Sequence, residues 1–202
     1  MSDMVSVNTV IGWMNTIRNL PENQRYRALE SFWDTQLASK LWILKTIKEY
    51  KLDVSNVYIF GGWTGVLSSL LLSDKDLNVK KVYSIDIDPW CKPIAESMCI
   101  YDIRFAAICD DMKSFNMYGE PSLVINTSTE HVSQEVYNIW YDTIPANTNV
   151  IIQGNNFFSC KEHVRCSKNV DDFMLMNRVK NLSYSGELPN SQYTRFMSLF
   201  AI

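Results

Sequence analysis

The chain has only two histidines, and each directly follows a glutamate, in Glu130-His131 and Glu162-His163. A neutral imidazole can take a proton from a substrate hydroxyl, amine or carboxyl group, because its pKa lies close to neutral pH. A neighbouring glutamate can orient the imidazole or hold a cationic substrate. We therefore expect Glu130, His131 and His163 to perform acid–base chemistry or to face a substrate.

A second interpretation of the first Glu-His pair is structural. Residues 127–130 read TSTE, which fits a helix-capping box in which Thr127 or Ser128 caps the helix and Glu130 supports the cap. His131 would then lie in the first helical turn. The two interpretations are compatible with each other.

Cys160, His163 and Cys166 form a possible metal-ligand set at spacings of three residues. A structural zinc site takes four ligands, and this segment offers three that a helix would fan around its surface. We therefore expect no metal here.

Residues 58–65 read YIFGGWTG, a strand-like run that breaks into glycines before an apolar helix start. Glycines allow a tight turn and let backbone N–H groups approach a ligand at the helix N-terminus. The Gly-Lys-Ser/Thr ending of a Walker A loop is absent. Acids follow the next two strand-like runs: Asp86, which lies 25 positions beyond Gly61 and suits a ribose diol, and then Asp110 and Asp111, which suit an exocyclic amine.

The elements that must position these residues alternate from residue 54 onward. Short β-rich runs at 56–60, 81–86, 104–109, 122–127 and 149–154 alternate with helix-like segments at 65–74, 89–99, 132–144 and 169–179. This alternation predicts a parallel sheet in a three-layer α/β domain. Residues 181–189 and 193–202 predict an antiparallel hairpin at the sheet edge. Because ligands bind at the carboxyl ends of parallel strands, the polar residues after each strand, including Asn126, Asn155 and Asn156, should share one rim.

Two helices are predicted before the sheet, at residues 7–18 and 28–50, the second with a wide apolar stripe. We expect a helical segment, 1–50, packed on a domain formed by 51–202. Lys40, on the polar face of the second helix, either neutralises a carboxylate of a ligand or lies on a solvated face. Arg195, inside the last apolar strand, needs a partner if buried, and a rim acid would provide one.

The bulk composition limits the function classes. The 202 residues are 47% hydrophobic and 20% charged, with a net charge of −3, so the chain has no basic field for duplex nucleic acid. Five cysteines without a disulfide-scaffold spacing indicate reduced thiols. No stretch reaches membrane-spanning length and the first ten residues do not resemble a signal peptide, so we expect a cytoplasmic protein with no membrane partner.

The ordered series YIFGGWTG, SIDIDP, ICDDM, LVINT and IPANTNVIIQ, within residues 30–202, resembles the class I S-adenosylmethionine-dependent methyltransferases. The resemblance implies a Rossmann-like methyltransferase fold with S-adenosylmethionine as cofactor and a small or exposed polar acceptor for N or O methylation. It implies a cofactor site, and the polar residues at the strand ends predict an acceptor site beside it. The cofactor site would comprise Gly61, Gly62, Trp63, Gly65, Asp86, Asp110, Asp111 and Asn126. The acceptor side would comprise Lys40, Asn155, Asn156 and Arg195, beside the catalytic Glu130, His131 and His163.

One departure concerns the glycine loop, because Trp63 stands where the family has the middle glycine of Gly-x-Gly-x-Gly. Its indole either walls the cofactor pocket, which we favour, or packs inward. Two signatures of family members that methylate nucleic-acid bases are also absent after the fourth strand, where the chain reads NTST. One is Asp or Asn followed by two prolines and an aromatic residue, and the other is a Pro-Cys pair. The alternatives that remain are a catalytically silent, methyltransferase-like binding or scaffold protein and an NAD(P)-binding Rossmann enzyme, although the latter's Tyr-x-x-x-Lys pair is not visible.

Overall fold

The computed structural model describes residues 5–100 and 102–202 as seven α-helices, one short 3-10 helix (η1) and one seven-stranded sheet. The helical elements are α1 (Val7–Asn19), α2 (Glu22–Glu30), α3 (Asp34–Glu49), α4 (Val66–Ser73), α5 (Cys91–Met98), η1 (Thr129–His131), α6 (Gln134–Asp142) and α7 (Val170–Met176). The strands are β1 (Asn56–Phe60), β2 (Lys81–Asp86), β3 (Phe105–Cys109), β4 (Leu123–Asn126), β5 (Asn149–Asn155), β6 (Leu182–Pro189) and β7 (Thr194–Ala201).

The strands lie in the order β3-β2-β1-β4-β5-β7-β6. The first five in this order are parallel, and β7 is antiparallel to both β5 and β6. The predicted parallel sheet with an antiparallel hairpin edge is therefore confirmed. The order reverses between β1 and β4, which makes the carboxyl ends of these two strands the switch point where ligands bind in open α/β sheets.

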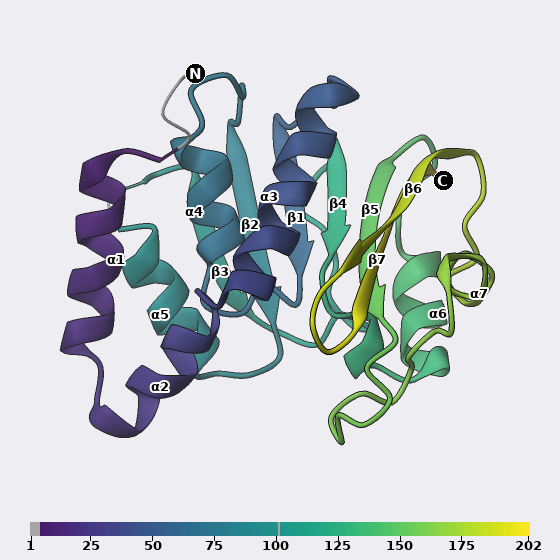
Figure 1. The fold of residues 1–202 in the computed structure, drawn as a ribbon. Helices are drawn as coiled ribbons and strands as arrows, with labels where there is room; N and C mark the ends of the chain where they lie inside the picture. Colours follow the sequence, from purple (N-terminus) through teal and green to yellow (C-terminus); the bar gives the residue numbers. More distant parts are fainter. Residues whose placement is uncertain (1–4, 101) are drawn as a thin grey trace.

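Two apolar layers cover the two faces of the sheet. Along β1, Val57 and Ile59 belong to the cluster under α1, α3, α4 and α5, whereas Tyr58 and Phe60 belong to the cluster under α6 and α7. Figure 1 shows α3 and α4 in front of the strands. This alternation is the two-residue period of a strand that is buried on both faces.

The helix predicted over residues 28–50 is broken, which corrects that prediction. Trp33 has an extended ψ of 149° and separates α2 from α3, so the two helices run in different directions (Figure 1). The break places Phe32 against Trp13 with ring centroids 5.3 Å apart. Asp34 in the first turn then favours a new helix start.

The N-terminal helices share the main core. Trp13 and Ile17 of α1 and Ile43, Leu44 and Ile47 of α3 belong to the same buried cluster as the strands. The first four residues of the predicted 1–50 segment lie outside the described residues. Within the described part of the chain, no helix is long and apolar enough to cross a membrane.

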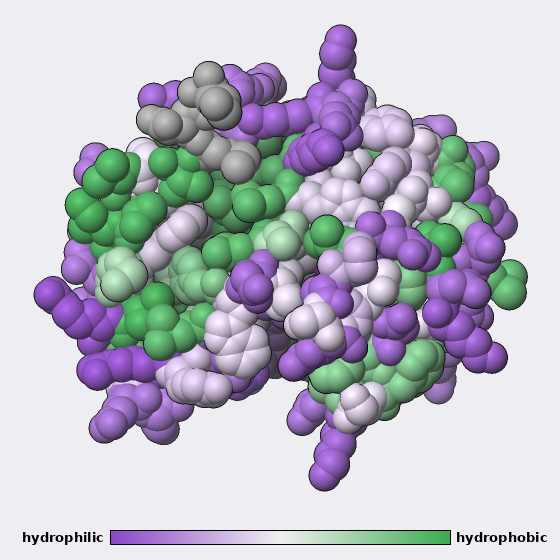
Figure 2. Space-filling view, viewed as in Figure 1, coloured by the Kyte–Doolittle hydropathy of each residue, from purple (hydrophilic) through white to green (hydrophobic). Residues whose placement is uncertain are grey.

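The outer face of α1 is apolar as well. Val7, Val10, Ile11 and Met14 are exposed, and Figure 2 shows apolar side chains gathered on the side of the molecule where α1 lies.

Candidate functional site

The glycine loop between β1 and α4 is tied to the end of β2. Gly62 N–H donates to the Ile85 carbonyl at 3.1 Å, and Trp63 N–H donates to Asp86 Oδ2 at 2.9 Å. Gly65 has a φ of +79°, and a Cβ there would lie 3.0 Å from Ala95 Cα, so this position needs glycine. The sequence thus fixes a tight turn that faces the switch point.

Trp63 itself has a φ of +49°, the left-handed conformation that glycine adopts without strain. Its side chain is partly exposed and lies outside the two described core clusters. Lys40 Nζ is 5.9 Å from the indole centroid. The alternative in which Trp63 packs into the core is therefore wrong, and the ring lies beside α3 at the rim.

Asp86 is the acid that joins the loop to the rim. Its Oδ2 accepts from Trp63, its Oδ1 accepts from the Asp88 N–H at 3.0 Å, and the carboxylate stays partly exposed. Asp88 is instead occupied by Arg27, 2.6 Å away on α2. Burial opposes ionisation of Asp88, but the Trp90 N–H and the Arg27 guanidinium hold the pKa of its carboxyl below the ordinary value. Of the two acids, Asp86 is the one that forms no salt bridge among the described residues.

Asp110 and Asp111 follow β3 at the same edge. Asp110 N–H donates to the Asp86 carbonyl at 3.1 Å, so the ends of β2 and β3 are joined. The Asp110 side chain is exposed, whereas Asp111 lies 3.4 Å from Lys113 Nζ. Asp110 is therefore the less occupied of the two carboxylates.

Asn126, at the end of β4, is fully buried. Its Oδ1 accepts from the Ser128 N–H at 3.0 Å, and its Nδ2 is 4.0 Å from Met112 Sδ. These contacts shape the loop that carries Glu130.

Glu130 is the centre of a buried polar group, with a side chain that is only 2% exposed. Its Oε1 accepts from Asn155 Nδ2 at 2.6 Å and lies 3.5 Å from Arg195 Nη1. Its Oε2 has no hydrogen-bond partner among the described residues. The expected pairing of Arg195 with a rim acid is therefore found.

The capping-box interpretation of residues 127–130 is wrong. Ser133 caps α6 instead, accepting from the Val136 N–H at 3.2 Å, and Glu130 and His131 lie in η1 before that helix. Glu130 therefore points to Asn155 and Arg195 in place of a helix end.

The two histidines meet edge to face, with ring centroids 4.6 Å apart. His131 Nδ1 lies 3.2 Å from the Glu162 carbonyl, which can only accept, so Nδ1 carries the proton. Burial lowers the pKa of His163 below its ordinary value, and the neighbouring His131 acts in the same direction while Glu130 opposes it. The structure thus brings together all three residues that the sequence selected for acid–base chemistry.

Lys40 does not lie on a solvated face, which corrects that alternative. Its ammonium donates to the Gln36 carbonyl at 3.2 Å, and among the described residues no carboxylate pairs with it. Burial, followed by the charge of Arg195, lowers the pKa of Lys40 to about 7. The residue as a whole keeps partial exposure, so water moderates the cost of its charge.

Asn156 binds a neighbouring strand. Its Oδ1 accepts from the Thr194 N–H at 2.7 Å, which fastens the end of β5 to the start of β7.

Sequence reasoning missed Arg165, which is 6% exposed. Its guanidinium lies 4.0 Å from the Tyr137 centroid, donates from Nε to the Thr129 carbonyl at 3.2 Å and donates from Nη2 to Asn177 Oδ1 at 2.8 Å. It supports η1 from the side of α6. Arg165 lies in a stretch without helical or strand periodicity, so no sequence pattern marked it for this role.

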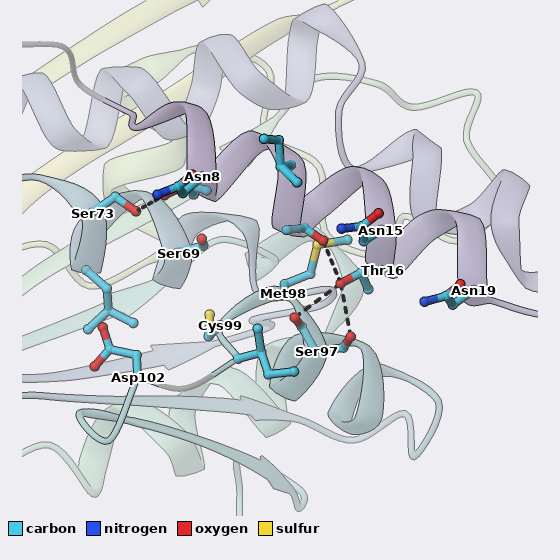
Figure 3. A pocket seen from close by; sticks show the side chains of 15 residues that line it. Asn8, Asn15, Thr16, Asn19, Ser69, Ser73, Ser97, Met98, Cys99 and Asp102 are labelled. Atoms are coloured by element: carbon cyan, nitrogen blue, oxygen red, sulfur yellow. Dashed lines mark hydrogen bonds between the residues drawn. The ribbon is translucent and has the colours of Figure 1, made fainter.

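Two of the hollows in the described part of the chain lie away from the glycine loop. One, of about 570 Å³, runs between α1 and the helices α4 and α5, with Asn15, Thr16 and Ser97 on its walls (Figure 3). The other, of about 330 Å³, lies between the start of α3 and the β6–β7 turn. Arg195 lines this second hollow and also contacts Glu130, so the second hollow adjoins the polar cluster.

No protein-family model matches the chain, and no curated protein matches it by sequence. Solved structures do match. The N-methyltransferase NodS from Bradyrhizobium japonicum WM9, in complex with S-adenosyl-L-homocysteine, aligns with a TM-score of 0.69 and 11% identity over 94% of this chain and 97% of that chain. A S-adenosylmethionine-dependent methyltransferase from Clostridium acetobutylicum ATCC 824 aligns with a TM-score of 0.64 and 12% identity over 88% and 98%.

Magnesium protoporphyrin IX methyltransferase (ChlM) from Synechocystis PCC 6803, with bound S-adenosylhomocysteine, aligns with a TM-score of 0.61 and 13% identity over 96% of this chain and 94% of that chain. At these identities the likeness is one of fold. The chain has the Rossmann-like methyltransferase fold over nearly its whole length.

Proposed function

We propose that this protein is an S-adenosylmethionine-dependent methyltransferase that acts on a small or exposed polar acceptor. The observation that carries the proposal is the coupling of the glycine loop to Asp86, through the Trp63 N–H, at the carboxyl edge of β1 and β2. Two of the structural neighbours, NodS and ChlM, were solved with S-adenosylhomocysteine bound. The same fold with an acid in this place supports the same cofactor here.

The glycine loop, Asp86 and the Asp110–Asp111 pair would hold the cofactor. Asp86 would accept hydrogen bonds from the ribose hydroxyls, and the exposed Asp110 would accept from the adenine amine. Backbone N–H groups at the start of α4 would face the amino-acid end. When bound, the cofactor supplies an electrophilic methyl group.

The acceptor side would lie at Glu130, His131 and His163. Transfer of a methyl group in line needs positioning and exclusion of water, with at most one base. His131 carries its proton on Nδ1, which leaves Nε2 as the atom that takes a proton from an N–H or O–H acceptor. Arg195 is already paired with Glu130, so Lys40 is the basic group on this side that would receive a negative group of the acceptor.

A second candidate function is a binding protein with the same fold and no turnover. Trp63 favours it, because an indole in a left-handed loop position occupies space that a glycine would leave open. The buried Glu130 and the histidine pair favour the enzyme, since a scaffold has no need of them.

Calorimetric titration with S-adenosylmethionine, S-adenosylhomocysteine and NAD in parallel tests the proposal. We expect micromolar binding of both adenosyl ligands and none of NAD. Binding without methylation of any acceptor in a lysate that contains labelled cofactor would favour the binding protein. Binding of NAD alone would overturn both functions in favour of a nicotinamide enzyme.

We also place the protein in a reducing compartment such as the cytoplasm. All five cysteines are free of disulfides, and two of them, Cys91 and Cys99, are buried with thiol pKa values raised by burial. This usage is typical of reduced proteins.

A further inference from the structure

We propose that Glu130, His131 and His163 bind one divalent transition-metal ion. One carboxylate oxygen and one ring nitrogen from each histidine lie within 4.8 Å of one another. The inference goes beyond methyl transfer and reassigns the Nε2 lone pair of His131. A nitrogen that binds the ion cannot also take a proton, so with the ion bound the cluster would position the acceptor instead of deprotonating it.

The backbone brings the three residues together from two distant segments. Val164 N–H and Arg165 N–H both donate to the Glu130 carbonyl, at 2.9 and 3.1 Å, so the loop after β5 is fastened to η1. The Arg165 side chain fixes η1 a second time through the Thr129 carbonyl. His163 is therefore held beside His131 by main-chain bonds that do not depend on either imidazole.

The carboxylate of Glu130 has one oxygen to offer. Asn155 and Arg195 take Oε1, whereas Oε2 is buried and lacks a partner among the described residues. A buried carboxylate oxygen without a partner is costly, and a cation would relieve that cost. Asn155 meanwhile orients the carboxylate as an outer hydrogen bond orients a metal ligand.

His131 has the matching arrangement. Donation from Nδ1 to the Glu162 carbonyl at 3.2 Å fixes the tautomer and leaves the lone pair of Nε2 available. Metal-binding histidines commonly donate their other ring N–H to a backbone carbonyl in this way.

The ligand types select the metal. Two imidazoles and one carboxylate suit the ions from Mn²⁺ to Zn²⁺, whereas Mg²⁺ and Ca²⁺ prefer oxygen ligands alone. Three protein ligands leave at least one position for water or an acceptor. Metal bonds of this kind hold ligand atoms about 3 to 3.5 Å apart, so the side chains must close by about 1 Å around the ion.

Two neighbouring side chains would change how tightly the cluster binds the ion. Arg195 Nη1, 3.5 Å from the other oxygen of Glu130, repels a cation and weakens binding. Cys166 Sγ lies 3.8 Å from His163 Nδ1 and could join as a further ligand. The experiment has to separate these contributions.

The test is metal titration of the full chain after removal of bound ions with EDTA and dialysis. Co²⁺ is followed by visible absorption, and Zn²⁺ by calorimetry. We expect one ion per chain with micromolar affinity or better, and a loss of about ten-fold or more in affinity for His131→Ala and for His163→Ala. Absence of saturable binding below millimolar metal would overturn the inference, and so would binding that both histidine variants leave unchanged.

Glu162→Gln is the matched control, because it changes an exposed side chain beside the cluster and keeps the carbonyl that holds His131. Affinity should stay within about three-fold of wild type. Cys160→Ser and Cys166→Ser test for a thiol site. If these two variants lost all metal binding while the histidine variants kept it, the inference would be overturned. Titration with S-adenosylmethionine on the same samples separates the two proposals, since each ligand can bind while the other fails.

Discussion

Asp86 receives two backbone N–H groups, from Trp63 and Asp88, and still reaches the surface of the rim. Asp86 therefore stabilises the glycine loop in addition to any role in binding a ligand. An alanine substitution would remove both together. Asparagine removes the charge but keeps the side-chain shape and one of the two accepting oxygens, so it disturbs the loop less than alanine does.

We expect Asp86→Asn to weaken binding of S-adenosylmethionine by about ten- to a hundred-fold, because hydrogen bonds to a charged acceptor contribute about 1.5 to 3 kcal/mol. Calorimetry measures the affinity, and circular dichroism checks the fold. Asp88→Asn is the control, since Asp88 is already paired with Arg27. Equal affinities of Asp86→Asn and wild type would remove Asp86 from the cofactor site.

The lowered pKa of Lys40 predicts how folding stability depends on pH. The unfolded chain releases this proton near its ordinary pKa of 10.5, whereas the folded chain releases it near 7. Between these values the unfolded state binds more protons, so folding stability should rise with pH there, and below pH 7 the folded protein carries the full cost of a buried charge.

Lys40→Met removes that cost while keeping the length of the side chain. We expect the variant to be more stable than wild type at pH 6, with a margin that shrinks steadily toward pH 10. Urea unfolding at several pH values measures it. Arg195, Gln36 and Trp63 surround Lys40 in both proteins; a margin independent of pH would mean that the lysine stays protonated.

At the scale of residues, the residue types and their order along the chain predicted which side chains belong to the candidate site. Burial in the fold then determined which partners and which pKa values those side chains have. Arg195 was expected to pair with an acid because a charged side chain that is buried in an apolar strand needs a partner of opposite charge. That Glu130 would be its partner, and that Lys40 would be enclosed, could not be predicted, because both depend on side chains from η1, α3 and β7 meeting in three dimensions.

At the scale of elements, the contact between η1 and β7 is the most consequential. Glu130 and Arg195 are 2% and 7% exposed in their side chains. Breaking a buried pair leaves one charge without compensation, which costs about 3 to 5 kcal/mol. We therefore expect Arg195→Met to lower the free energy of unfolding by that amount, measured by urea denaturation.

The exposed pair Arg178–Asp142 is the control for this experiment. Their side chains are 38% and 63% exposed, so Arg178→Met should cost about 1 kcal/mol or less. Adding Glu130→Gln to Arg195→Met should recover part of the loss. Equal losses in Arg195→Met and Arg178→Met would show that the buried pair contributes no more to stability than the exposed one.

The elements themselves were largely predictable. Each strand and the helices after β1, β2, β4 and β5 follow from apolar period and turn residues. The break between α2 and α3 was missed, because Phe32 and Trp33 continue the apolar stripe across it. Only the packing of Phe32 on Trp13 reveals why the chain turns there.

At the scale of the whole molecule, α1 belongs to the same core as the sheet. Trp13 is 8% exposed and donates from Nε1 to Ser69 Oγ of α4 at 2.9 Å. We expect Trp13→Ala to cost about 3 to 5 kcal/mol and to move a single unfolding transition, seen alike by fluorescence and circular dichroism.

Met14, the next residue, is 62% exposed, so Met14→Ala should change stability by about 0.5 kcal/mol or less. Two separate transitions in wild type would support instead an N-terminal segment that unfolds apart from residues 51–202. The division of the chain at residue 50 stays a prediction until that is measured.

The place of β7 in the sheet has a consequence for synthesis on the ribosome. Both of its partners, β5 and β6, are made before it, yet they are joined only through it. Until residues 194–201 emerge, β5 presents an unpaired edge and Glu130 lacks its arginine partner. A nascent chain at this stage therefore exposes a strand edge that favours aggregation.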